Sequence, residues 1–402
     1  MAKCDHVKRD LLFGRQSRQC AVLFATSLWL AGCATVVPRT PPQIAPPVVQ
    51  TPTESKPPLA SELPRDVGRH RVALLVPMTG TNAGVGQAIA NAANMAVLET
   101  GGQNLRVTIY DTANGPGAAA QKALVEGNQL ILGPLLAEDV RSVAPIARAA
   151  HVPVVSFTND SSIGGNGVWA MGFAPDQAIN RVVSFAAEKG MTKIAGLAPN
   201  GLYGQRAATA LLRATENAGG QVVSVQNYDH TAPSRLAAVS RLKQGSPFDA
   251  VLVADQGKDA VILAPLIRKS GAVSAHILGT ELWNVDHGLG QSSALRGAWY
   301  ASVSDALYAQ LATKYRARFG KAPPRLASLG FDAVLLATNI SRDWKSGAGF
   351  PVNKLTDKGG FVGIDGVFRF TKDGVAERSL QVNEITATGT KIVSPAPQSL
   401  GN

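Results

Sequence analysis

The 402-residue sequence contains only three cysteines, Cys4, Cys20 and Cys33. The chain after Cys33 therefore cannot form a disulfide, hold a cysteine metal site or use a thiol nucleophile. It also lacks the G-x-S-x-G, H-E-x-x-H and C-x-x-C motifs, which are frequent signatures of hydrolases, zinc proteases and dithiol oxidoreductases. These absences argue against an enzyme.

Three further patterns are missing. The formal net charge is +11, but no run of basic residues concentrates it, so nucleic acid is not a predicted partner. Gly84 and Gly86 open a predicted helix without the third glycine of a dinucleotide-binding fingerprint. His276 and His287 flank Glu281, but their spacing is not that of a standard metal site. The sequence predicts no metal and no cofactor.

The first 32 residues form a predicted targeting segment. Residues 1–19 carry five basic and two acidic side chains, and residues 21–32 are mostly apolar. An apolar run of this length is shorter than the roughly 20 residues of a membrane-spanning helix, and it fits a secretory signal. Residues 34–70 then hold nine prolines. They predict an extended tether with a reach of roughly 100 Å.

The stretch Leu30-Ala31-Gly32-Cys33 resembles the lipobox of bacterial lipoproteins. The resemblance implies that residues 1–32 are removed and that Cys33 carries the lipid, which anchors the protein in a membrane. Several acyl chains are needed for stable anchoring, since one binds only marginally. Ala34, rather than aspartate, implies the outer membrane, with the protein facing the periplasm. The alternatives are an ordinary cleaved signal and a chance apolar run.

Beyond the tether, short apolar segments alternate with amphipathic ones. Strands are predicted over 71–78, 105–112, 129–134 and 152–157, with helices between them, and the alternation begins again after residue 173. Such alternation indicates parallel sheets covered on both faces. The sequence predicts an α/β protein with two doubly wound parallel-sheet lobes and a ligand cleft between them. An antiparallel hairpin is expected around Asp373-Gly374.

Polar residues follow the predicted strands, where ligands bind in open parallel sheets. The candidate ligand-binding residues are Thr79, Thr81, Ser156, Thr158, Tyr203, Glu281 and Trp283. Thr79 and Thr81 belong to the loop before the first helix, whose backbone amides can bind an anion, although its glycines also suit tight packing. Trp283 can stack on a ring in the cleft or pack in the core.

Several stretches resemble the type I periplasmic binding proteins of the leucine-binding class. They are PMTGTNAGVGQAI (77–89), ILGPL (131–135), APNGLYGQRA (198–207) and SLGFDAVLLA (328–337). A subgroup of lipoproteins, the penicillin-binding protein activators, is similar over more of the chain, including VWAMGFAPDQ (168–177) and GFVGIDGVFRF (360–370). The likeness covers residues 71–396, with 397–402 as a tail. It implies one lobe of 71–172 and 304–347 and a second of 173–303 and 348–396.

The resemblance also implies roles at the cleft. Tyr203 and Glu281 match the tyrosine and glutamate that hold an amino-acid ligand, and Ser156 and Thr158 could offer hydroxyls to its carboxylate. The segment 137–139 departs from the family pattern, because Glu138 and Asp139 stand where hydroxyls are expected. Two carboxylates repel a free carboxylate.

Three functions follow from these patterns. The first is an envelope lipoprotein that supports peptidoglycan synthesis by contact with a penicillin-binding protein. The second is a substrate-binding lipoprotein of an ABC transporter, for an amino acid or related small molecule. The third is an enzyme. The tether and the altered 137–139 segment favour the first, whereas Tyr203 and Glu281 favour the second.

Overall fold

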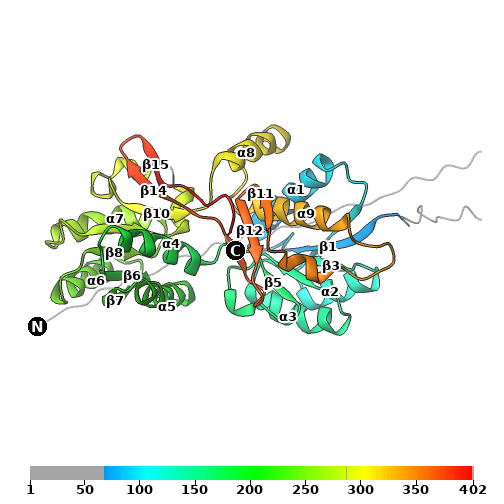
Figure 1. Cartoon of the computed structure of the whole chain (residues 1–402), viewed down its shortest axis with the longest axis horizontal. Coiled ribbons are helices and arrows are strands. Elements are labelled where there is room, and N and C mark those ends of the chain that lie inside the picture. Colours follow the sequence, from blue (N-terminus) through cyan, green and yellow to red (C-terminus); the bar gives the residue numbers. More distant parts are fainter. Residues whose placement is uncertain (1–67, 287, 401–402) are drawn as a thin grey trace, which may run out of the picture. The chain divides into compact units, whose positions relative to one another are not determined.

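The computed structural model describes residues 68–286 and 288–400 (Figure 1). The account below concerns the unit Pro64–Asn402. The predicted signal peptide, Cys33 and most of the tether lie outside the described residues. Among the described helices, none is both long and apolar enough to cross a membrane.

Five parallel strands form the sheet of the first lobe, in the order β2-β1-β3-β4-β5. They are β1 (His70–Val76), β2 (Leu105–Asp111), β3 (Leu130–Leu132), β4 (Val154–Ser156) and β5 (Val168–Ala170). Successive residues of a strand point to opposite faces. Leu74 accordingly packs in one core cluster and Leu75 in another, which explains why β1 is apolar along its whole length.

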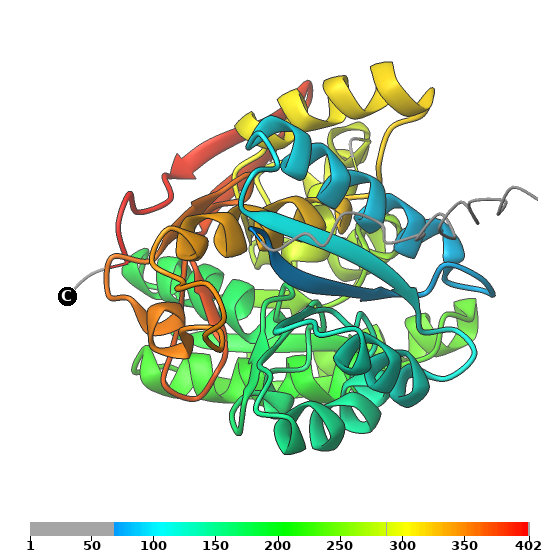
Figure 2. The ribbon, with the colours of Figure 1, turned by 90° about the vertical axis from the view of Figure 1, so that its right-hand side faces the viewer.

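Helices cover both faces of this sheet. The first face carries α1 (Ala83–Glu99) and α9 (Ala327–Ser341), together with part of α8 (Ala306–Phe319), and the second carries α2 (Pro116–Val125) and α3 (Ala137–Ala149). Figure 2 shows α1 and α9 on one side of β1 and β2, and α2 and α3 on the other. The predicted doubly wound lobe is confirmed.

The second lobe repeats this plan. Its sheet order is β15-β14-β10-β9-β8-β6-β7, in which the parallel strands β6 to β10 are arranged as are β1 to β5. These strands are β6 (Lys193–Pro199), β7 (Gln221–Tyr228), β8 (Ala250–Val253), β9 (His276–Gly279) and β10 (Trp299–Ser302). The antiparallel strands β14 (Gln381–Thr386) and β15 (Gly389–Ser394) extend the sheet. Helices α4 (Pro175–Glu188) and α5 (Leu202–Asn217) pack on one face, and α6 (Ala232–Gln244) and α7 (Gly257–Lys269) on the other.

A third, antiparallel sheet corrects one expectation. It contains β11 (Phe361–Gly363), β12 (Gly366–Phe370) and β13 (Ala376–Arg378), and the predicted Asp373-Gly374 hairpin joins the last two. Its phenylalanines pack in the core of the first lobe, although residues 348–396 were expected in the second. The reason is α9, which is buried almost all round and needs a cover on its outer side. Figure 1 shows β11 and β12 beside α9, with β14 and β15 beside β10.

Three segments connect the lobes: 171–174, 303–305 and 379–380. Two arginines, the buried Arg378 and the partly buried Arg325, tie them to the small sheet. Arg378 donates from Nη2 to the carbonyl of Met171 at 2.5 Å. Arg325 donates to the carbonyl of Ser304 at 3.1 Å and forms an ion pair with Asp365 at 2.7 Å. Side chains of the first lobe therefore fix the connecting segments.

Gly86 in α1 and Gly204 in α5 occupy equivalent places in the two lobes. Each lies in the helix that follows the first strand of its lobe. A Cβ atom at Gly86 would lie 1.9 Å from the carbonyl oxygen of Pro77, and one at Gly204 would lie 1.7 Å from that of Pro199. Glycine at these positions therefore lets the helix approach the strand end.

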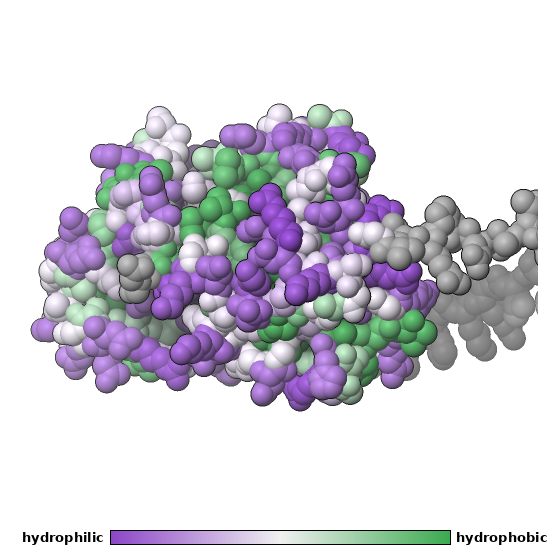
Figure 3. All heavy atoms as spheres, turned by 45° about the vertical axis from the view of Figure 1, so that its right-hand side comes forward, coloured by the Kyte–Doolittle hydropathy of each residue, from purple (hydrophilic) through white to green (hydrophobic). Residues whose placement is uncertain are grey.

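The surface of the described residues is mixed in polarity. Figure 3 shows hydrophilic side chains around smaller hydrophobic areas on one face. The most exposed large apolar side chains are Val125 in α2, Val273 after α7 and Val362 in β11. They are distributed over both lobes.

Candidate functional site

The threonines of the first loop differ in what they offer to a ligand. Asp111, at the end of β2, accepts hydrogen bonds from the Thr79 hydroxyl at 2.7 Å and from the backbone N–H groups of Met78 and Ala113. Burial of Asp111 opposes its ionisation, but these donors prevail and lower its pKa. The Thr79 hydroxyl is thus committed to Asp111, whereas Thr81 is exposed.

Ser156 and Thr158 are not presented to a ligand, contrary to expectation. Ser156 is 0% exposed, and its hydroxyl donates to the carbonyl of Pro134 at 2.8 Å and accepts from the N–H of Thr158. The Thr158 hydroxyl accepts from the N–H of Asp160 at 3.1 Å. Buried backbone groups need partners, and these hydroxyls supply them in the loop after β4.

The segment after β3 begins α3 with two acids. Glu138 is exposed and Asp139 is half-buried. Burial, followed by the charge of Glu138, raises the pKa of Asp139. Carboxylates in a first helical turn are favoured by the helix dipole. The first lobe therefore presents negative charge where the resemblance implies hydroxyls.

The second lobe brings together two of the predicted residues. The Tyr203 hydroxyl lies 3.1 Å from the Thr280 hydroxyl and donates to Glu281 Oε1 at 3.3 Å. Burial, followed by the charge of Glu281, raises the pKa of Tyr203 well above its ordinary value. Burial also raises the pKa of Glu281 to about 7, and its Oε2 atom has no hydrogen-bond partner among the described residues. This part of the second lobe is suited to a group that donates hydrogen bonds to Glu281.

Trp283 is a core residue rather than a lining of the cleft. It is 0% exposed, and its indole N–H donates to the carbonyl of Asp255 at 3.1 Å. Its ring covers Gly279, the last residue of β9. Strand β9 ends at Gly279, and a 3₁₀ turn, η2 (Glu281–Val285), directs the ring into the core.

His276 also serves packing. Its ring lies 3.7 Å from the ring of Trp299, and burial, with the positive charge of Arg268, lowers its pKa to about 4. Asp286 accepts a hydrogen bond from the N–H of Lys258 at 3.1 Å. His287 lies outside the described residues.

A second polar cluster, unnoticed in the sequence, lies where β7 and β8 end. Asp255 accepts from the Tyr228 hydroxyl at 2.6 Å, and His230 Nδ1 lies 3.6 Å from Asp255 and 3.3 Å from Asp259. The side chains of His230, Asp255 and Asp259 are close enough together to hold a cation. Arg235 already forms an ion pair with Asp259, so a protein cation compensates the buried charge.

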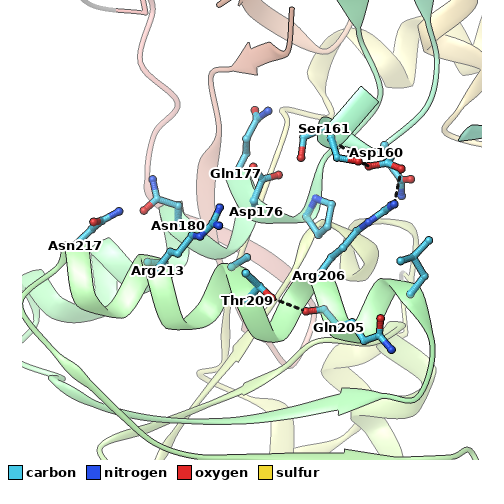
Figure 4. A pocket seen from close by; sticks show the side chains of 16 residues that line it. Asp160, Ser161, Asp176, Gln177, Asn180, Gln205, Arg206, Thr209, Arg213 and Asn217 are labelled. Atoms are coloured by element: carbon cyan, nitrogen blue, oxygen red, sulfur yellow. Dashed lines mark hydrogen bonds and ion pairs between the residues drawn. The ribbon is translucent and has the colours of Figure 1, made fainter. Parts of the chain in front are cut away.

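The structure also contains a pocket that the sequence did not suggest. Its volume is about 440 Å³, and it is lined by the 159–162 loop of the first lobe and by α4 and α5 of the second. Figure 4 shows Asp160 and Arg206 at one end and Asn180, Arg213 and Asn217 toward the other. Hydrophilic residues dispersed along two helices give no local motif, so only the fold reveals them as neighbours.

The pKa of Glu281 leads to a pH prediction. Between its ordinary pKa of 4.5 and about 7, the unfolded chain loses this proton while the folded chain keeps it. The stability contributed by the neutral carboxyl is therefore present below pH 4.5 and lost as the pH rises to about 7. Relative to Glu281→Gln, the wild type should lose about 3 kcal/mol over this range. Denaturant titrations from pH 4 to 8 measure the difference, and a constant difference contradicts it. The exposed Glu216→Gln substitution, in α5 (Leu202–Asn217), is the control for loss of one carboxyl.

Comparison with known proteins agrees with this architecture. The profile of a family described as periplasmic binding protein matches residues 70–390. A putative branched-chain amino acid ABC transporter protein from Rhodospirillum rubrum superposes with a TM-score of 0.70 at 18% identity, covering 81% of this chain and 100% of that one. The leucine-binding protein LivK of Thermotoga maritima gives 0.60 at 18% identity, with 81% and 98% covered.

Two other relatives are longer than the shared region. Full-length LpoA from Haemophilus influenzae superposes with a TM-score of 0.64 at 16% identity, covering 81% of this chain and 59% of that one. An uncharacterized protein of Rickettsia prowazekii is 21% identical over 228 residues, which are 54% of this chain and 61% of the relative. The family match spans most of the sequence, and the two lobes have the expected topology. The chain therefore belongs to the periplasmic binding protein family, with the type I, leucine-binding-like fold.

Proposed function

We propose that this protein is a non-enzymatic lipoprotein of the cell envelope that supports peptidoglycan synthesis by contact with a penicillin-binding protein. The observation that carries the proposal is the state of the first-lobe residues. The hydroxyls of Ser156 and Thr158 are used within their own loop, and Glu138 and Asp139 begin α3. This set of first-lobe side chains is poorly suited to bind the carboxylate of a free amino acid. A binding fold with an altered ligand site supports a role in protein contact.

The anchor and tether fit this proposal. A lipid on Cys33 would hold the protein at a membrane, which we propose to be the outer membrane, on its periplasmic side. The proline-rich tether, at roughly 100 Å, would let the folded body reach a partner away from that membrane.

A direct test uses purified protein and a penicillin-binding protein from the same cell. We expect the rate of glycan polymerisation from a labelled lipid-linked precursor to rise with added protein and then to saturate. The two proteins should also co-sediment. A polymerisation rate that stays unchanged at all concentrations contradicts the proposal.

The alternative function is a substrate-binding protein of an ABC transporter. The cluster of Tyr203, Thr280 and Glu281 favours it, because a buried carboxylate with a free oxygen suits a ligand ammonium group. The two functions differ in the small molecules they require.

The proposed function predicts no tight binding of ordinary zwitterionic amino acids. Glu138 and Asp139 repel the ligand carboxylate even where Glu281 attracts its ammonium group. A ligand at 100 times its dissociation constant stabilises a protein by about 2.7 kcal/mol, so thermal unfolding against an amino-acid panel measures this. We expect no shift in the melting temperature. A clear shift with leucine or glutamate, abolished by Glu281→Ala, would establish the transport receptor instead.

The anchor predicts the effect of Cys33→Ser. The variant should move from the membrane fraction to the soluble fraction with its thermal unfolding unchanged, because Cys33 precedes the folded body. Mass spectrometry of the wild type should find acyl chains on a protein that begins at residue 33. A wild type that is unmodified and soluble would refute the proposed anchor.

A further inference from the structure

We propose that the pocket between α4, α5 and the 159–162 loop is a binding site for a small polar ligand that carries a carboxylate. The lining of this pocket includes neither Tyr203 nor Glu281. The inference holds under either function considered above. A volume of about 440 Å³ falls within the range of ligand pockets in proteins.

One end of the pocket is closed by a neutralised carboxylate. Asp160 is 1% exposed and forms ion pairs with Arg206 at 2.5 Å and with Arg141 at 3.3 Å. It also accepts a hydrogen bond from the N–H of Ser162. Two guanidinium groups on one carboxylate leave an excess of positive charge, so this end does not repel an anion.

The other end offers free donors. Arg213 and Asn217 are four residues apart on α5 and share one face of it, and Asn180 of α4 lies opposite (Figure 4). Within residues 68–286 and 288–400, no hydrogen bond or ion pair engages these three side chains. A guanidinium group binds a carboxylate through two parallel hydrogen bonds, and carboxamides donate further ones. This combination favours an anionic group that offers two oxygens, such as a carboxylate, over neutral polar groups.

The size and walls of the pocket restrict the rest of the ligand. Arg206 and Arg213 are seven residues apart, which is about 10 Å along a helix and the length of about three extended residues. Gln177 is held in the wall, since it donates to the carbonyl of Ala376 at 2.5 Å and accepts from the N–H of Arg378 at 2.9 Å. Asp176 is exposed at the start of α4, where its carboxylate is available to accept hydrogen bonds. The ligand should therefore carry amide or hydroxyl donors as well as its carboxylate.

The pocket also depends on the arrangement of the two lobes. One wall of the pocket is the 159–162 loop of the first lobe, and the opposite wall is formed by α4 and α5 of the second. The Arg206–Asp160 ion pair joins the two walls. A ligand that fills it binds this arrangement and stabilises it.

Ligand-observed NMR on the purified full chain tests the proposal with two pairs of probes. The first pair is N-acetyl-trialanine with a free carboxylate and the same peptide as its carboxy-terminal amide. The second pair is digalacturonate and its methyl ester. We expect at least one free acid to bind and its blocked form to bind about ten-fold more weakly or not at all. Binding of the peptide or of the sugar acid identifies the source of the carboxylate.

The matched variants are Arg213→Gln and Arg318→Gln. Both remove one exposed arginine, but Arg318 lies in α8, away from the pocket lining. Arg213→Gln should weaken binding of the free acid about ten-fold and leave thermal unfolding unchanged, while Arg318→Gln should change neither. Equal binding of acid and blocked forms, binding unaffected by Arg213→Gln, or no binding of either acid overturns the proposal.

Discussion

Replacement of Arg325 by methionine should lower the free energy of unfolding by about 3–5 kcal/mol, the usual cost of breaking a buried ion pair from one side. Arg325 pairs with Asp365, which is 0% exposed, and its guanidinium group lies 4.2 Å from the ring of Tyr308. Without Arg325, Asp365 keeps the Ser328 hydroxyl as a partner but loses its nearest cation. Denaturant titration should show an earlier midpoint.

The neighbouring acid makes this loss more severe. Burial, followed by the charge of Asp365, raises the pKa of Asp332 to about 7. The two buried carboxyls therefore already oppose each other while Arg325 is present. Adding Asp365→Asn to Arg325→Met removes one buried charge, so the double variant should recover part of the lost stability.

An exposed ion pair provides the control for Arg325. Lys354 pairs with Asp343 at 2.7 Å, with both side chains accessible to solvent. Lys354→Met should cost at most about 1 kcal/mol, as is usual for surface pairs. If the two single variants lose equal stability, the buried network does not hold the connecting segments as argued.

The second large effect is expected at Gly86. Gly86→Ala should cost about 3 kcal/mol, because the new methyl group would collide with the backbone carbonyl of Pro77 at 1.9 Å. Gly84 lies two positions before Gly86 in the same helix, and a Cβ atom at Gly84 would meet nothing within 4 Å. Gly84→Ala should instead stabilise the protein by up to about 1 kcal/mol, since alanine has the higher helix propensity.

The opposite effects of Gly86→Ala and Gly84→Ala on stability distinguish a glycine required for close helix–strand packing from one that only adds backbone flexibility. Thermal unfolding of the two variants, measured side by side, should move in opposite directions. Gly204→Ala tests the equivalent position of the second lobe, where Pro199 occupies the place of Pro77. Destabilisation by all three substitutions to a similar extent would show that helix packing is not the reason for these glycines.

The alternation of strands and helices was predictable because each buried strand must be apolar and each covering helix amphipathic. Tyr203 and Glu281 were both predicted as ligand-binding residues, and the structure places the Tyr203 hydroxyl 3.3 Å from Glu281 Oε1. Both follow strands of one parallel sheet, and the ends of such strands meet at one edge. The local sequence pattern was sufficient to predict a residue's position wherever that position follows from the order of strands in the sheet.

The remainder depended on distant contacts. Antiparallel strands of three to six residues have the same alternation whichever lobe they join, so the pattern could not assign β11 to β13 to the first. The hydroxyls of Ser156 and Thr158 and the ring of Trp283 were predicted by residue type, but the direction of a side chain is set by the backbone after its strand. The pocket beside Arg213 required the relation of two helices to a loop of the other lobe.

The interleaved order of the lobes has a consequence for synthesis. The core of the first lobe includes Phe361 and Ala376, and the sheet of the second is completed by β14 and β15. A chain made from its amino terminus therefore completes the core under α2 and α3 early, but it lacks the rest of the first-lobe core and the full sheet of the second lobe until nearly all of it exists. Contacts this far apart in sequence form slowly. We expect the growing chain to remain unfolded enough to pass through a narrow channel. We also expect that a stop codon late in the coding sequence prevents both lobes from folding.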